Sequence, residues 1–245
     1  MTNQNISIIN DLDDNFSKSK LAHQFTNGSS KEQFELIPQL INMGNTGWEI
    51  LIDFLKLSNI DNIDLVQGEV FRELYQVKMP ETELFIQEYF PNGLAPLDSQ
   101  VNINYKSLSK LLLEQNFQEA DTLTRKILLE LAGESALQRK WVYFTEVANF
   151  PVMDLNTINT LWWLYSGGKF GFSVQRKLWL SAGKDFNTLW RKIGWKKGNH
   201  WTRYPKEFTW NLSAPNGHLP LLNQLRGARV ADSIFSHSVW SEKNW

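Results

Sequence analysis

Apolar residues recur at intervals of three and four along most of the chain, which is the spacing of amphipathic helices. In residues 1–78 the clearest examples are Leu36, Ile37, Leu40 and Ile41, followed by Trp48, Leu51, Ile52 and Leu55. The stretch Gly44–Gly47 interrupts the pattern between these two runs. We therefore expect residues 1–78 to form an N-terminal helical bundle that packs on itself or docks a partner.

Pro80 and the proline- and glycine-containing stretch 91–98 mark a boundary, and the second domain is expected to span residues 79–245. Its periodic segments predict helices at 81–89, 107–115, 117–131, 156–165, 173–180, 185–194 and about 219–234. Ser173 and Asp185 are the expected N-caps of two of them. Because no segment alternates convincingly with a period of two, the sequence predicts an all-α fold.

Aromatic residues add a candidate binding surface to this picture. Most of the 11 tryptophans lie between Trp141 and Trp210, with phenylalanines and tyrosines among them. A buried aromatic side chain removes about 150–250 Å² from water, so a few rings suffice for the core of such a domain. Either some of these rings are exposed, or they line a concavity that receives a large, flat, apolar ligand.

Charge and composition exclude several other functions. The net charge of −1 gives no general attraction to nucleic acid or anionic lipid, and the absence of cysteine excludes disulfides and thiolate chemistry. The four histidines lack metal-ligand spacing, and no catalytic motif is present, so we expect neither a metal site nor catalytic residues. The apolar runs are too short for a membrane span. The acidic N-terminal sequence fits neither a signal peptide nor a transit peptide.

The segment 184–206 mixes basic residues with Trp195, Trp201 and Tyr204. Such interleaving can bind single-stranded nucleic acid by stacking and phosphate contact, but it is equally typical of a solvated surface. A helical protein- or nucleic-acid-interaction module therefore remains an alternative to a domain that binds a flat apolar ligand.

Asn223, Arg226 and Arg229 follow a three-residue step, so the predicted last helix would carry them on one side beside apolar neighbours. Arginine next to apolar surface suits a ligand with a hydrophobic body and a carboxylate edge. The alternative, which the residues alone leave equally open, is that these arginines bond acids of the same domain, such as Glu146 or Asp232.

Six blocks of the second domain carry a resemblance to a known family, and they occur in the family's order. They are residues 119–125, 138–147, 159–163, 171–176, 208–215 and 217–226. Together they resemble the "genomes uncoupled four" proteins, which are tetrapyrrole-binding accessory factors of magnesium chelatase in oxygenic phototrophs. The resemblance covers roughly residues 80–245, and residues 1–78 look like the more variable helical domain of cyanobacterial-type members.

The resemblance implies a cupped-hand helical domain whose apolar palm receives protoporphyrin IX and Mg-protoporphyrin IX, with heme as a further candidate. Carried over by motif and by the loop beside it, the porphyrin-binding residues are Phe144, Val147, Trp201, Tyr204, Phe208, Asn223, Arg226 and Arg229. Asn223 is expected to reach the porphyrin metal through water. Phe117, Leu137 and Phe150 are weaker candidates for the opposite wall of the palm.

The resemblance also implies a role without catalysis of its own and without a required cofactor. The alternatives are an interaction module with no tetrapyrrole ligand and an enzyme that acts on a tetrapyrrole. The expected partner is the large porphyrin-binding subunit of magnesium chelatase, whose rate the protein would raise in chlorophyll biosynthesis. We expect a monomer with no nucleic-acid partner and at most peripheral membrane contact. Its expected location is the cyanobacterial cytoplasm or the plastid stroma, where it could be plastid-encoded.

Overall fold

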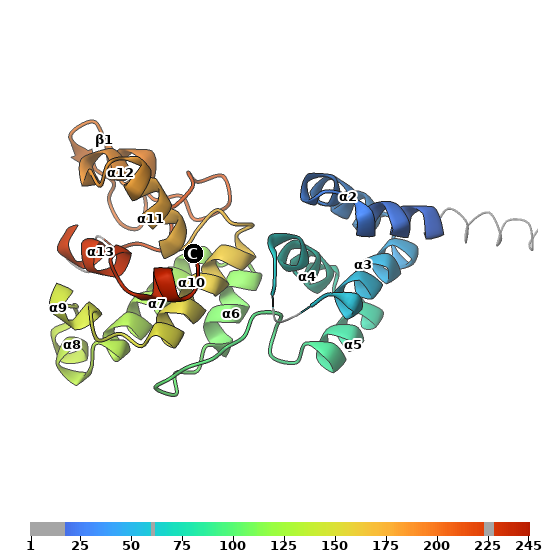
Figure 1. The fold of residues 1–245 in the computed structure, drawn as a ribbon, viewed down its shortest axis with the longest axis horizontal. Coiled ribbons are helices and arrows are strands. Elements are labelled where there is room, and N and C mark those ends of the chain that lie inside the picture. Colours follow the sequence, from blue (N-terminus) through green and yellow to red (C-terminus); the bar gives the residue numbers. More distant parts are fainter. Residues whose placement is uncertain (1–17, 60–61, 223–227) are drawn as a thin grey trace, which may run out of the picture. The chain divides into compact units, whose positions relative to one another are not determined.

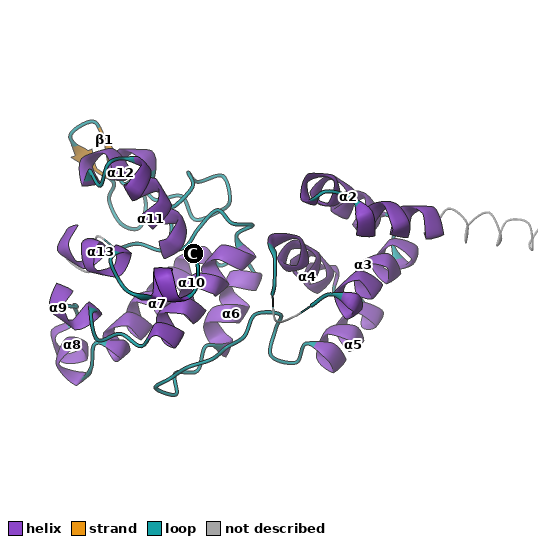
Figure 2. Cartoon of the chain, viewed as in Figure 1, coloured by secondary structure: helices purple, strands orange, loops and turns teal. Residues whose placement is uncertain are grey.

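The computed structural model describes residues 18–59, 62–222 and 228–245. The chain divides into two compact units, Met1–Leu94 and Ala95–Trp245. Helices make up nearly all of the regular structure in the described parts of both units (Figures 1 and 2). The all-α prediction is therefore confirmed. None of the helices in these parts is long and apolar enough to span a bilayer.

The N-terminal unit consists of short helices that pack on one another. After a helical stretch at 18–27, they are α2 (Ser30–Asn42), α3 (Asn45–Leu57), α4 (Leu65–Val77) and α5 (Pro80–Tyr89). The first two of these pack together and against α4, and α5 packs on both α3 and α4. Capping boxes begin α2 at Ser29 and α4 at Asp64, so the chain itself satisfies backbone donors at both starts.

Gly47 lies where α3 crosses α2, and it does not interrupt a helix as the apolar pattern suggested. The helix α3 begins at Asn45, and Gly47 is buried in its first turn. A Cβ atom at Gly47 would lie 1.8 Å from the carbonyl oxygen of Leu40, so the close approach of the two helices requires glycine. The Trp48 Nε1 atom donates to the carbonyl oxygen of Ile41 at 3.1 Å and ties the same crossing together.

The domain boundary lies farther along the chain than we predicted. Pro80 is the first residue of α5, a position where proline is well tolerated, and it does not separate two domains. The Phe90 ring, directly after α5, lies 5.5 Å from Phe71 of α4 and 5.6 Å from Phe85 of α5. These contacts place α5 in the N-terminal unit, so the boundary moves from residue 78 to Leu94.

The C-terminal unit contains more helices, several of them short. They are α6 (Lys106–Leu113), α7 (Phe117–Leu131), α8 (Glu134–Arg139), α9 (Phe144–Val147), α10 (Val152–Tyr165), α11 (Phe172–Ser181), α12 (Phe186–Lys192), α13 (Ala228–Phe235) and α14 (Val239–Glu242). Two antiparallel strands, β1 (Lys196–Lys197) and β2 (His200–Trp201), form a small hairpin that the sequence pattern did not predict. The short helices α8, α9 and α14 were not predicted either.

Helix α10 forms the core of this unit. It packs on α6, α11 and α14, and apolar residues are buried on all its sides, as expected for a central helix. The Trp162 ring is fully buried and stacks on Phe117 with ring centres 6.0 Å apart. Its Nε1 atom donates to Thr124 Oγ1 at 2.9 Å, which satisfies the buried indole. Trp162, Trp179 and Trp190 are buried, and Trp163 is half-buried, so these tryptophans of the aromatic stretch belong mainly to the core.

Two predicted helix starts have different outcomes. Asp185 caps α12, where its carboxylate accepts from the backbone N–H of Thr188 at 2.7 Å, as expected. Ser173 is not the N-cap of α11, because Gly171 takes that position with a φ of 116°. The Ser173 backbone N–H instead donates to Asn159 Oδ1 at 2.8 Å inside the unit.

The last predicted helix is shorter than its apolar pattern suggested. Residues 219–222 are not helical, whereas α13 covers Ala228–Phe235. The reason is that side chains from other helices bind the backbone of residues 220 and 221, as described below. Asn223 and Arg226 lie outside the described residues, so their predicted alignment with Arg229 on one helix face stays a prediction.

Candidate functional site

The loop between β2 and residue 222 is held in place by a buried histidine. His218 Nδ1 lies 2.6 Å from the carbonyl oxygen of Ile193, and its Nε2 atom accepts from the backbone N–H of Thr209 at 3.1 Å. Because a carbonyl can only accept, Nδ1 carries the proton and Nε2 is free of one. Burial lowers the pKa of His218, which favours this neutral form. The histidine thus has a structural role.

Helix α11 anchors the next part of the same loop through Gln175. This side chain is fully buried, and its Nε2 atom donates to the carbonyl oxygens of Gly217 at 3.0 Å and Pro220 at 2.7 Å. The Trp195 Nε1 atom donates to the carbonyl oxygen of His218 at 2.7 Å. Backbone carbonyl groups that could otherwise accept the hydrogen bonds of a helix are therefore already bonded to side chains.

Helix α7 holds the end of the loop through Asp121. Its Oδ1 atom accepts from the backbone N–H of Leu221 at 2.7 Å. Burial raises the pKa of Asp121 to about 7, although this hydrogen bond and the charge of Arg125 act in the opposite direction. Asp121 belongs to the first block of the resemblance, residues 119–125. Through Asp121 this block fixes the backbone of the chain just before Asn223.

The predicted loop aromatics differ in exposure. Trp201 and Tyr204 are 49% and 43% exposed, whereas Phe208 is only 5% exposed. The Tyr204 hydroxyl lies 3.4 Å from Thr122 Oγ1, so the loop contacts α7 next to Asp121. Phe208 faces the His218 ring at 5.5 Å and the Trp210 ring at 6.0 Å. Tyr204 and Trp201 can contact a ligand directly, while Phe208 supports the loop from below.

A second group of predicted residues lies on α9 and α13, which pack together. Phe144 is 40% exposed at the start of α9, and Arg229 is exposed on α13. The guanidinium carbon of Arg229 lies 5.5 Å from the centre of the Phe144 ring, a cation–π contact. Val147 is fully buried at the other end of α9, the helix that carries Phe144. The structure thus places the predicted residues in two groups, one on α9 and α13 and one in the loop.

The alternative role considered for the arginines is not found for Arg229. Glu146 instead pairs with Arg139, whose Nη2 atom donates to both carboxylate oxygens at 2.8 and 2.7 Å. Arg139 also lies over the Tyr143 ring, 4.3 Å from its centre. Arg229 makes no ion pair with any described residue, Asp232 included, which leaves its charge available above Phe144.

Sequence reasoning missed the Arg139–Glu146 pair, although both residues fall in one block of the resemblance. The signal was present, since opposite charges in one short block are candidates for a pair. Two of the weaker wall candidates, Phe117 and Phe150, are buried core residues and cannot line an open surface. Leu137 on α8 is exposed and remains a candidate.

The aromatic residues of the basic segment 184–206 differ in exposure, since Trp201 and Tyr204 are exposed and Trp195 is not. Trp195 is fully buried against Trp190, with parallel rings 5.0 Å apart. Trp201 is exposed beside Lys196 and an open hollow of about 610 Å³ that is lined by residues between Asn199 and Glu207. Within the described parts of the chain, no cluster of three or more metal-ligating side chains is found.

The fold and these two groups define a helical protein with aromatic and arginine side chains on its surface. Residues 98–238 match the family described as GUN4-like, and residues 9–91 match its ARM-like N-terminal repeat domain. The "Ycf53-like protein" of Synechocystis sp. is 51% identical over 228 residues, which cover 93% of this chain and 98% of that protein. The chain therefore belongs to the GUN4-like family.

Two further similarities extend this assignment to algae and plants. The "Tetrapyrrole-binding protein, chloroplastic" of Arabidopsis thaliana is 40% identical over 143 residues, which cover 55% of this chain and 54% of that protein. The solved structure of GUN4 from Chlamydomonas reinhardtii has a TM-score of 0.56 at 37% identity and covers 60% of this chain and 94% of its own. These relatives are cyanobacterial, chloroplastic and algal.

Proposed function

We propose that this protein binds a porphyrin, protoporphyrin IX or Mg-protoporphyrin IX, at the surface formed by α9, α13 and the loop around Tyr204. The observation that carries the proposal is the Arg229 guanidinium, which has no ion-pair partner among the described residues and lies over the exposed ring of Phe144. A porphyrin has flat apolar faces and an edge with two carboxylates. Such a ligand can stack on Phe144 and place a carboxylate on Arg229.

Most of the binding free energy would come from the porphyrin faces. Burial of apolar surface contributes about 25 cal/mol per Å², and a porphyrin offers two large faces. Arg229 would orient the carboxylate edge, and Tyr204 and Trp201 offer exposed rings in the loop. The name of the Arabidopsis thaliana relative, a tetrapyrrole-binding protein, supports the same ligand class.

A titration with protoporphyrin IX tests this surface, with quenching of tryptophan emission as the readout. We expect both Phe144→Ala and Arg229→Gln to weaken binding about tenfold, which corresponds to about 1.4 kcal/mol. Leu180→Ala is the matched control, because Leu180 is exposed to a similar degree on α11 and belongs to neither group. Equal affinity in the wild type and both site variants would place the site elsewhere. Phe208→Ala is a poorer test, since Phe208 is buried against His218.

We further propose that the bound porphyrin passes between this protein and the large porphyrin-binding subunit of magnesium chelatase. The protein itself supplies no catalytic residue and no resident metal in this scheme; it delivers the substrate or withdraws the product. Membership of the GUN4-like family and the chloroplastic and cyanobacterial relatives support this role and a location in the cyanobacterial cytoplasm or the plastid stroma.

The chelatase step is tested with purified chelatase at limiting protoporphyrin IX. We expect the wild-type protein to raise the rate of magnesium insertion and Phe144→Ala to raise it less, in proportion to its loss of porphyrin affinity. The Leu180→Ala variant should stimulate like the wild type. An unchanged rate with and without the wild-type protein would contradict this role while leaving porphyrin binding itself intact.

A further inference from the structure

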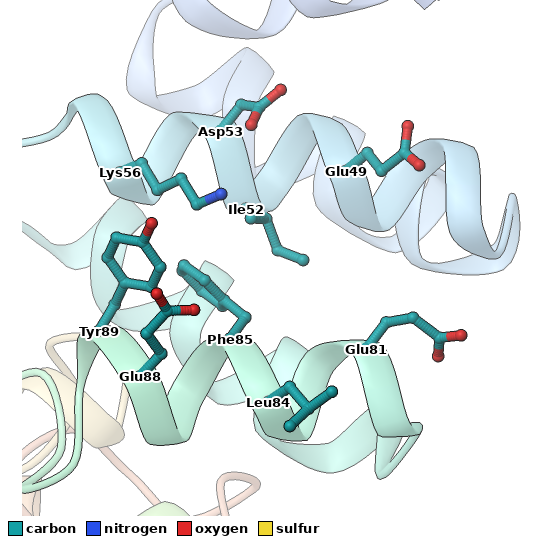
Figure 3. A pocket seen from close by; sticks show the side chains of 9 residues that line it. All are labelled: Glu49, Ile52, Asp53, Lys56, Glu81, Leu84, Phe85, Glu88 and Tyr89. Carbon is teal, nitrogen blue, oxygen red and sulfur yellow. The ribbon is translucent and has the colours of Figure 1, made fainter.

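The N-terminal unit contains an open groove between α3 and α5 (Figure 3). Its volume is about 390 Å³, and its lining residues recur at intervals of three and four on both helices. These intervals put the lining residues of each helix on one face. The groove therefore runs along two helices that pack together, and it has the form that an additional helix can fill.

The floor of the groove is apolar and incompletely covered. Phe85 is buried between the helices, and Ile52 lies opposite it on α3 (Figure 3). Leu84 is 65% exposed, and Tyr89 is exposed at the end of α5. A partner with an apolar stripe would remove Leu84 and Tyr89 from water, which is favourable.

The rim of the groove is acidic. It carries four carboxylates, from Glu49, Asp53, Glu81 and Glu88, against the single ammonium group of Lys56. Lys56 Nζ lies over the rings of Tyr89 and Phe85, 5.1 and 5.8 Å from their centres. Only Glu49 pairs with a described cation, Lys18.

The other three carboxylates, those of Asp53, Glu81 and Glu88, form no ion pair with a described residue. They lie along both sides of an apolar floor, so a ligand on that floor would meet negative charge on either side. Lys56 does not offset this charge fully, being one cation against four acids. The rim is thus complementary to a cationic partner and repels an anionic one.

We propose that this groove docks a basic amphipathic helix of a partner protein, with apolar residues of that helix on Leu84 and Tyr89 and its lysines or arginines on Asp53, Glu81 and Glu88. Recognition of this kind uses apolar anchors at helical spacing and opposite charges at the rim. Helical-repeat proteins commonly bind partners on such surfaces between stacked helices, and residues 9–91 match an ARM-like repeat domain. Nucleic acid and anionic membranes are disfavoured, because both would face the carboxylates.

The test uses the full chain and a fluorescently labelled helical peptide of about 18 residues, with leucines on one face and lysines on the other. Anisotropy should show that the peptide binds the wild-type protein and that added salt weakens the binding. A scrambled peptide without an apolar face and a peptide with glutamates in place of lysines should bind at least about tenfold more weakly. No binding of the basic peptide, or equal binding of all three peptides, overturns the proposal.

Variants of the protein locate the binding to the groove. The triple variant Asp53→Asn, Glu81→Gln, Glu88→Gln should bind the basic peptide about tenfold or more weakly, because three small electrostatic contributions are lost together. The matched control, Glu35→Gln, Glu119→Gln, Glu134→Gln, removes the same charge from exposed acids outside the groove and should bind like the wild type. Leu84→Ser should weaken the apolar contact, so the peptide should lose the part of its affinity that remains at high salt. An equal loss in the control would reduce the effect to net charge and overturn the proposal.

Two further measurements separate this proposal from the others. Porphyrin affinity should be unchanged in the groove variant, so failure of peptide docking and failure of porphyrin binding are distinguishable. Sedimentation of the wild-type protein and the groove variant tests whether a second copy occupies the groove. A dimer that the groove substitutions abolish would replace the proposed occupant by the chain itself, whereas monomers in both cases agree with a separate partner.

Discussion

Replacement of Gly47 by alanine is expected to destabilise the N-terminal unit strongly. Helix propensity alone predicts a gain of about 1 kcal/mol, because alanine is the better helix former. The added Cβ atom would lie 1.8 Å from the carbonyl oxygen of Leu40, however, and only a shift of two packed helices can relieve that contact. Overpacking of this kind costs about 1–3 kcal/mol, and a clash with backbone belongs at or above the upper end of that range.

Urea unfolding followed by far-UV circular dichroism measures this effect. Thr46→Ala is the matched control, since Thr46 is exposed in the same turn of α3 and an added helix former there meets no obstacle. Tryptophan emission should change little at the same urea concentration, because Trp48 is the only tryptophan before residue 95. A Gly47→Ala variant as stable as the wild type would mean that α2 and α3 separate more easily than their packing implies.

Substitution of Asp121 by asparagine is expected to change how stability depends on pH. In the unfolded chain the carboxyl loses its proton near its ordinary pKa of 3.8, but in the folded protein it keeps the proton up to a pKa of about 7. Between these values the folded state binds more protons, so wild-type stability should fall as the pH rises, by up to about 1.4 kcal/mol per pH unit. The variant lacks this titration and retains an oxygen that can accept from the Leu221 N–H.

The quantity to measure is the free energy of unfolding of Asp121→Asn minus that of the wild type, from urea titrations at several pH values. This difference should grow from about pH 4 to about pH 7 and then level off. His218 and His237, whose pKa values are lowered by burial, titrate in both proteins and cancel in the difference. Asp232→Asn is the control, because it replaces an exposed carboxyl group by an amide. A difference that stays constant over this range would falsify the assignment of a buried, proton-retaining Asp121.

The helix pattern was predictable wherever one apolar face meets a core. The spacing of apolar residues predicted α7, and the residue type of Asp185 predicted the N-cap there. Both features depend on local backbone and side-chain preferences. It failed at residues 219–222, where the same apolar spacing occurs without a helix. There Gln175 and Asp121, both distant in sequence, bind the backbone of the loop. The spacing of apolar residues cannot predict such hydrogen bonds, because it does not show which side chains from distant parts of the sequence lie next to the loop.

The candidate site was predictable in its residue types and less so in its exposure. Phe144, Tyr204 and Trp201 lie on the surface as a ligand site requires, but Phe208 and Val147 are buried supports. A phenylalanine or valine is equally suited to a core and to a ligand surface, so its type alone cannot distinguish these positions. Arg229 is different, because its guanidinium lies over the exposed Phe144 ring and makes no ion pair with a described residue, so its charge can meet a carboxylate of a ligand.

The Arg139–Glu146 pair has a consequence for how the protein would respond to its surroundings. Helix α9 has only four residues and cannot persist through its own hydrogen bonds. Glu146 holds it by binding Arg139 and by accepting from the backbone N–H of Tyr143 at 2.7 Å, so the position of Phe144 depends on an ion pair that is partly open to solvent. Ionic strength would therefore alter an apolar contact, and even an uncharged flat ligand would bind with a salt dependence inherited from the protein.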